Sequence, residues 1–143
     1  TYPLADIEKM LHYMVQHHYD FVSGRRFPLK YAPVMPVSSR IGNRITSWVM
    51  QTLLQIKFKD FMTGMWTFKK EILPLIMSHV PGMAFSLEIK INAWCNSDIK
   101  CGEFHIDYHE RVGDSKFNRI EDSIKTLQLI GQIKRNRNRL GNG

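Results

Sequence analysis

Two cations bracket a short glycine- and serine-containing segment in the last third of the chain. Arg111 opens the segment and Lys116 closes it. Between them lie Gly113, which permits close backbone approach, and Ser115, which offers a hydroxyl. Two cations at this spacing can supply charge-assisted hydrogen bonds to phosphate oxygens. The segment therefore predicts a phosphate-binding loop, with a solvated hairpin-like loop as the alternative.

A second candidate segment has the pattern D-x-x-T-G-M-W and begins at Asp60. It places a carboxylate and a flexible backbone at Gly64 beside the aromatic ring of Trp66. Such a set can contact a polar ligand. An Asp-x-x-Thr-Gly sequence is also a good structural turn, so the pattern alone leaves both interpretations open.

Two histidines and a carboxylate share one face of an alternating segment at residues 103–109. His105, Asp107 and His109 are a possible metal set. Successive same-face residues of a strand are about 7 Å apart, too far for three short side chains to meet at one ion without a bulge. A solvated polar face is favoured there. No P-loop, GxGxxG or Ser-His-Asp pattern is present.

The elements that must position these residues alternate between helix and strand. The first helix is predicted from an apolar stripe formed by Ile7, Met10, Leu11, Met14 and Val15. A buried strand is expected at residues 19–24, where a short apolar run ends in glycine. Helix followed closely by strand is typical of an α/β protein.

The next segment, residues 25–36, contains three prolines and cannot be regular throughout. Ser38 and Ser39 are expected to cap a second helix. Its apolar stripe is Ile41, Ile45, Trp48, Val49 and Leu53.

The second half of the chain continues the same alternation. Residues 60–68 predict a turn running into a strand, and residues 69–79 a short helix broken or kinked at Pro74. A further helix is expected at 84–95 and a strand at 103–109. A last helix should carry Ile120, Ile124, Leu127 and Ile133, followed by a basic tail.

Charge and composition limit the class of protein. Hydrophobic residues make up 43% of the 143 residues and charged residues 23%, which is typical of a globular domain. The net charge is +7, and residues 111–143 hold eight Lys/Arg and three Asp/Glu, a net of +5. This bias indicates a polyanionic partner. Two cysteines are too few for a disulfide framework, which favours a reducing compartment.

Several short motifs occur in a specific order. They are S-G-R at residues 23–25, S-R-x-x-N at 39–43, D-x-x-T-G at 60–64, F-x-x-E at 85–88 and R-x-G-x-S-K at 111–116, after an initial T-Y-P. The ordered set, over residues 1–130, resembles the C-terminal half of dolichyl-phosphate mannosyltransferase-like enzymes of glycosyltransferase family 2.

The resemblance implies an α/β fold of the GT-A type, a three-layer α/β/α sandwich that is incomplete because the N-terminal nucleotide-binding strands are missing. Residues 1–130 would be the acceptor-side part of that domain and residues 131–143 a basic tail. The implied reaction is metal-dependent transfer of a hexose, with inversion, from a GDP- or UDP-linked nucleotide sugar to a polyprenyl phosphate, dolichyl or undecaprenyl. It would occur at the cytoplasmic face of a membrane. The Mg²⁺ or Mn²⁺ ligands would lie mostly outside this chain, next to Thr1.

The resemblance also implies roles for individual residues. Phosphate groups would be bound by Arg25, Ser39, Arg40, Asn43, Arg111, Ser115 and Lys116. Asp60, Arg111 and Lys116 would be catalytic, and Thr63, Gly64 and Glu88 would form the sugar pocket. Met35 stands where such enzymes often carry an arginine, so Arg40 or Lys30 would substitute, or the acceptor differs.

Two alternatives remain open from the sequence. One is a family 2 transferase with a non-lipid acceptor, and the other is a noncatalytic module that binds anionic lipid or nucleic acid. Nucleic acid is not expected, because the aromatic residues follow core periodicities and do not interleave with the cations. Contact with an anionic membrane surface is predicted from Trp48 and Met50 on the second helix. The cations Lys134, Arg135, Arg137 and Arg139 support the same prediction.

Overall fold

The chain folds as an alternation of short helices and strands. The computed structural model describes residues 2–29, 35–78, 80, 83–109, 128 and 131. The elements are α1 (Ala5–Gln16), β1 (Phe21–Arg25), α2 (Val37–Leu54), β2 (Trp66–Phe68), a 3-10 turn η2 (Lys70–Ile72), α3 (Leu73–Ile76), α4 (Met83–Cys95) and β3 (Cys101–His105). The last predicted helix, the phosphate loop and the basic tail lie outside the described residues.

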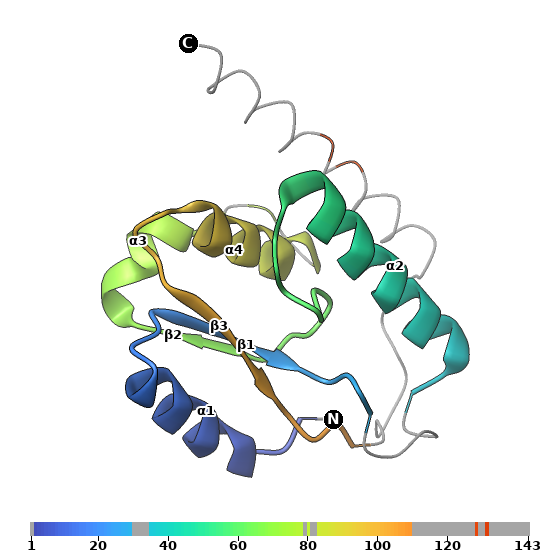
Figure 1. The fold of residues 1–143 in the computed structure, drawn as a ribbon, viewed down its shortest axis with the longest axis horizontal. Coiled ribbons are helices and arrows are strands. Elements are labelled where there is room, and N and C mark those ends of the chain that lie inside the picture. Colours follow the sequence, from blue (N-terminus) through green and yellow to red (C-terminus); the bar gives the residue numbers. More distant parts are fainter. Residues whose placement is uncertain are drawn as a thin grey trace.

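The described strands form one mixed sheet in the order β2-β1-β3 (Figure 1). Strand β1 is antiparallel to β2 and parallel to β3. In this register Val22 faces Thr67 on one side and Gly102 on the other, and Arg25 faces His105. The carboxyl ends of β1 and β3 therefore lie at the same edge of the sheet.

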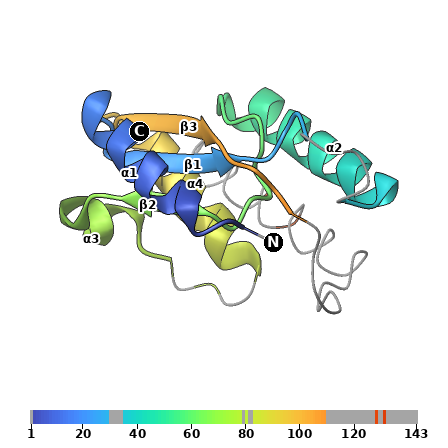
Figure 2. The same ribbon diagram turned by 90° about the horizontal axis from the view of Figure 1, so that it is seen from below.

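Helices cover both faces of this sheet (Figures 1 and 2). Because successive strand residues point to opposite faces, Phe21 packs into a core with α2, α3 and α4, whereas Val22 packs with α1. The structure confirms a mixed α/β protein. Helix α2 lies beyond the carboxyl end of β1 in both views.

The apolar stripe of α1 is only partly buried. Met10 and Met14 are buried, whereas Ile7, Leu11 and Val15 are exposed. The sheet is narrow, with three described strands, so it covers only one edge of the stripe. The predicted helix is confirmed, but fewer residues of its apolar stripe are buried than the pattern predicts.

Helix α2 buries a different face from the predicted one. Its buried residues are Ser47, Met50 and Leu54. Of the predicted stripe, Ile41, Ile45, Trp48 and Leu53 are exposed, and only Val49 is partly buried against the core. The helix is apolar on two sides, and periodicity cannot say which side meets the core. Ser47 fits the core because its Oγ accepts a hydrogen bond from the Phe61 backbone N–H at 3.0 Å.

Three finer predictions also need correction. Met50 is fully buried, so of the two residues expected at a membrane surface only Trp48 is exposed. The N-cap of α2 is Pro36, with Ser38 and Ser39 inside the first turn. Pro74 lies in the first turn of α3, where its missing N–H costs little, and does not kink a longer helix.

Strand β3 is shorter than the alternation of residues 103–109 indicated. It ends at His105, level with the last residue of β1, because its ladder partner ends there. One further hydrogen bond, from the Ile106 N–H to the Arg25 carbonyl at 3.0 Å, closes this edge. Among the described helices, none is long and apolar enough to cross a membrane.

Candidate functional site

The carboxyl edge of the two parallel strands collects most of the buried charge in the described structure. In open α/β sheets, ligands bind in the crevice outside the carboxyl ends of the strands. The chain between α2 and β2 returns to this edge, where the Gly24 N–H donates to the Met65 carbonyl at 2.8 Å. The D-x-x-T-G segment is thereby brought beside the end of β1.

Asp60 forms a buried ion pair with Arg26, the residue that follows β1. Arg26 Nε donates to Asp60 Oδ2 at 2.8 Å, Nη2 donates to Oδ1 at 2.8 Å, and the Arg26 backbone N–H donates to Oδ2 at 2.9 Å. Asp60 is 0% exposed and Arg26 6%. Burial opposes the charge of Arg26, but the hydrogen bonds and attraction to Asp60 outweigh it and raise its pKa. Both carboxylate oxygens are therefore committed within the protein.

Lys90 enters the same cluster from α4. Its Nζ donates to the Phe61 carbonyl at 2.8 Å and to the Thr63 carbonyl, and the side chain is 0% exposed. Burial lowers the pKa of Lys90 from 10.5 to about 7, against the attraction of Asp60. The ammonium thus holds the two backbone carbonyls of the turn that follows Asp60.

Glu103 of β3 fixes the start of the same turn. Its Oε1 accepts from the Lys59 N–H at 2.8 Å and from the Asp60 N–H at 3.1 Å. Burial raises the pKa of Glu103, although these two hydrogen bonds act in the opposite direction.

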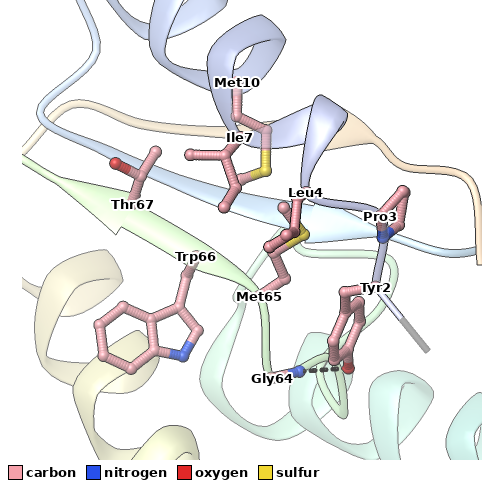
Figure 3. Close-up of a pocket in the computed structure, with 9 residues that line it drawn as sticks. All are labelled: Tyr2, Pro3, Leu4, Ile7, Met10, Gly64, Met65, Trp66 and Thr67. Carbon is pink, nitrogen blue, oxygen red and sulfur yellow. Dashed lines mark hydrogen bonds between the residues drawn. The ribbon is translucent and has the colours of Figure 1, made fainter.

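Tyr2 holds the far end of the turn. Its hydroxyl accepts a hydrogen bond from the Gly64 N–H at 2.7 Å (Figure 3). Beside it lies a hollow of about 290 Å³. Its lining residues are mostly apolar: Tyr2, Pro3, Leu4, Ile7, Met10, Gly64, Met65, Trp66 and Thr67. The indole of Trp66 points away from Met10 and donates to Ser86 Oγ at 3.1 Å.

Arg25 closes β1 with an unused donor. Its Nε is buried without a hydrogen-bond partner, as is the Oγ of Ser23 two residues earlier on the same face of the strand. Arg25 is close enough to Glu103 to pull the pKa of that carboxyl downward. A buried guanidinium N–H without an acceptor is uncommon and marks a position where an anion or water can bind.

The structure brings together some of the sequence-predicted site residues and separates others. Arg25, Asp60, Thr63 and Gly64 gather around the carboxyl edge of β1. Glu88 lies elsewhere, hydrogen-bonded to Ser78 Oγ.

The remaining predicted site residues lie on α2 or outside the description. Ser39, Arg40 and Asn43 lie in the first two turns of α2, where Asn43 Nδ2 donates to Met35 Sδ at 3.5 Å. Thr1, Arg111, Ser115 and Lys116 lie outside the described residues.

The described residues form no divalent-metal site of their own, and the resemblance implies that the Mg²⁺ or Mn²⁺ ligands lie mostly outside this chain. Within residues 2–29, 35–78, 80 and 83–109, no three His, Cys, Asp or Glu side chains converge to hold an ion. Asp60 has both oxygens bound to Arg26. His105 Nε2 lies 2.9 Å from the Pro28 carbonyl, a contact within the protein.

Two residues of the cluster, Arg26 and Lys90, are not predicted as site residues from the sequence. Arg26 is adjacent to Arg25, and nothing local distinguishes the two arginines. Lys90 carries a signal, because it stands between Ile89 and Ile91 in a mostly apolar helix that has no separate polar face. A cation there must be buried and must therefore have partners.

Comparison with known proteins gives one curated relative. The chain is 30% identical over 118 residues to the dolichyl-phosphate hexose transferase of Haloferax volcanii, a match that covers 82% of this chain and 50% of the relative. The chain thus spans about half the length of the curated relative it matches. No family model and no solved structure matches the chain. Over most of its length the chain is similar to part of a glycosyltransferase.

Proposed function

We propose that this chain forms the acceptor-side part of a glycosyltransferase that moves a hexose from a nucleotide-linked donor to a polyprenyl phosphate. One observation carries the proposal: the unpaired, buried Nε of Arg25 at the carboxyl edge of β1 and β3. The similarity to the Haloferax volcanii enzyme, whose name specifies a dolichyl phosphate and a hexose, supports the choice of reaction.

The chemistry needs positive charge more than it needs a base. A phosphate monoester is already an anion at neutral pH, since its second pKa is about 6. It can attack an anomeric carbon once it is oriented and its charge is balanced. In this proposal Arg25 binds the acceptor phosphate, and the loop from Arg111 to Lys116 completes the phosphate site.

Asp60 has a positioning role in this proposal. Its oxygens bind Arg26, so it neither abstracts a proton nor contacts the sugar directly. It anchors the turn in which Thr63 is buried and Gly64 is exposed, and Gly64 forms one wall of the sugar site. The reaction is a single displacement with inversion, and no covalent nucleophile takes part. The Mg²⁺ or Mn²⁺ expected from the resemblance would find its ligands outside the described residues.

A peripheral membrane contact belongs to the same proposal. The outward face of α2 carries Val37, Ile41, Ile45 and Trp48, each more than half exposed (65%, 53%, 56% and 63%). Arg44 flanks this face and is exposed. An apolar stripe beside a cation suits the boundary of an anionic bilayer, where a polyprenyl phosphate resides. Ile45→Ser should weaken flotation with anionic liposomes; unchanged flotation would refute this placement of the membrane.

The central test is a transfer assay with matched binding measurements. The protein is mixed with farnesyl phosphate, Mn²⁺ and radiolabelled GDP- or UDP-hexoses, and label is followed into the lipid phase. By NMR, farnesyl phosphate should shift the Arg25 Nε–H signal, and Arg25→Met should weaken binding at least tenfold. Lys57→Met, which removes an exposed cation, should bind like the wild type. Transfer to a soluble acceptor with none to lipid would refute the proposed acceptor and favour a soluble-acceptor transferase.

A further inference from the structure

A buried charged side chain lies near the centre of helix α4, whose residues are mostly apolar. Lys90 is 0% exposed and lies between Ile89 and Ile91, which are both buried in the core formed by α2, α3 and α4. Burying an ammonium is costly unless it is paired and hydrogen-bonded. Ordinary core packing would be served better by leucine or methionine at this position. Lys90 therefore has a structural role that an apolar side chain cannot fill.

The hydrogen bonds of Lys90 indicate this role. The Lys90 Nζ contacts the carbonyls of Phe61 and Thr63, and it lies 5.9 Å from the centre of the Phe61 ring. From the other end, the Tyr2 hydroxyl accepts the Gly64 N–H. The turn at residues 61–64 is thus held by side chains from α4 and from the start of the chain, with few bonds of its own.

The surrounding charges explain why the ammonium is tolerated. Asp60 and Glu103 face it and favour its protonated form, while Arg26 opposes that form. Arg26 after β1, Asp60 in the turn, Lys90 of α4 and the partly buried Glu103 of β3 together form a nearly neutral group. The net result is a lysine whose pKa is lowered to about 7, near physiological pH.

Building on the proposed function, we propose that Lys90 is a positioning residue whose ammonium sets the shape of the 61–64 turn and thereby the geometry of the ligand site beside Thr63 and Gly64. A neutral amine keeps two N–H donors but loses the charge assistance of its hydrogen bonds. Ligand binding at the turn should then weaken as Lys90 loses its proton. Lys90 itself does not touch the ligand, so it is not a catalytic residue.

The first arm of the test needs no ligand. Hydrogen exchange of single amides is measured by NMR in the wild type, Lys90→Met and the surface control Lys57→Met. In Lys90→Met the Gly64 and Met65 amides should exchange at least tenfold faster, while the β1–β3 ladder amides stay protected. Equal acceleration of all amides would show a general core role and overturn the proposal. Unchanged exchange at the turn would overturn it as well.

The second arm follows ligand affinity against pH. Farnesyl phosphate should bind the wild type more weakly as pH rises from 6 to 8, beyond the change that ligand ionisation causes in Lys90→Met. Lys57→Met should follow the wild type. If the wild type binds no farnesyl phosphate, the proposed function fails and the exchange arm still decides the role of Lys90. If Lys90→Met does not fold, the wild-type Gly64 exchange rate, corrected for intrinsic chemistry, must rise across pH 7 or the proposal is wrong.

Discussion

The buried ion pair between Arg26 and Asp60 predicts that neutralising Asp60 lowers the free energy of unfolding. Asp60→Asn keeps the shape of the side chain but removes its charge, and it places an NH₂ group where Arg26 now finds an oxygen. The substitution leaves a guanidinium that is 6% exposed without its counter-ion. Removing one partner of a buried pair typically costs about 3–5 kcal/mol. We expect a loss of about 3 kcal/mol in the free energy of unfolding.

The measurement is urea unfolding followed by tryptophan fluorescence and circular dichroism, with thermal unfolding in parallel. At about 2–4 °C per kcal/mol for a domain of this size, the melting temperature should fall by roughly 6–12 °C. Asp98→Asn serves as the control, because Asp98 is exposed and the same charge change there should cost under about 0.5 kcal/mol.

A double mutant separates the pair from its surroundings. Arg26→Met combined with Asp60→Leu removes both charges, so no unpaired guanidinium remains. It should be more stable than Asp60→Asn alone. In a cycle with the single variants Arg26→Met and Asp60→Leu, the coupling energy should be at least about 2 kcal/mol. A loss below about 1 kcal/mol in Asp60→Asn would refute the structural role. If that variant kept its stability and lost farnesyl phosphate binding, Asp60 would contact the ligand directly.

Three further outcomes follow from the described structure. The free energy of unfolding of the wild type should rise between pH 7 and 9, by up to about 1.4 kcal/mol per pH unit. The reason is that Lys90 keeps its proton in the unfolded chain (pKa 10.5) and releases it in the folded protein (pKa about 7). Urea unfolding of Lys90→Met should show no such rise with pH. Gly102→Ala should cost about 1–3 kcal/mol, since its Cβ would lie 2.7 Å from the Tyr19 ring, and a melting temperature within 1 °C of wild type would contradict this packing. Iodoacetamide at pH 8 should label exposed Cys95 well before Cys101, whose pKa burial raises to about 12, as peptide mass spectrometry would show.

The sequence predicts a helix or strand correctly where its apolar pattern and its flanking residues are local. Helix α4 and strand β1 lie within about two residues of the predicted bounds, because an apolar run and its flanking turn residues define each one. The sequence predicts the position of helix α2 correctly but predicts the wrong face of the helix as buried. Two of its faces are apolar, and only the contacts with Phe61 and the sheet decide which one is buried.

The candidate site was partly predictable for the same reason. Asp60, Thr63 and Gly64 stood out because a turn pattern is local. The partner of Asp60 did not, because Arg26 is 34 residues away and has a neighbouring arginine of the same type. Lys90 carried a signal in its apolar surroundings, but its acceptors are backbone carbonyls, which no sequence pattern identifies.

The turn at residues 60–64 has a consequence for the order of folding. Its partners are remote in sequence, with separations of 62 residues to Tyr2, 34 to Arg26, 27 to Lys90 and 43 to Glu103. Each contact closes a long loop, and long loops close late because their entropy must be offset by structure already formed. Phe61 of this turn is also fully buried in the core with α2, α3 and α4, so we expect the turn to assemble together with that core and not as an early local unit. The site would then exist only in chains whose folding is complete.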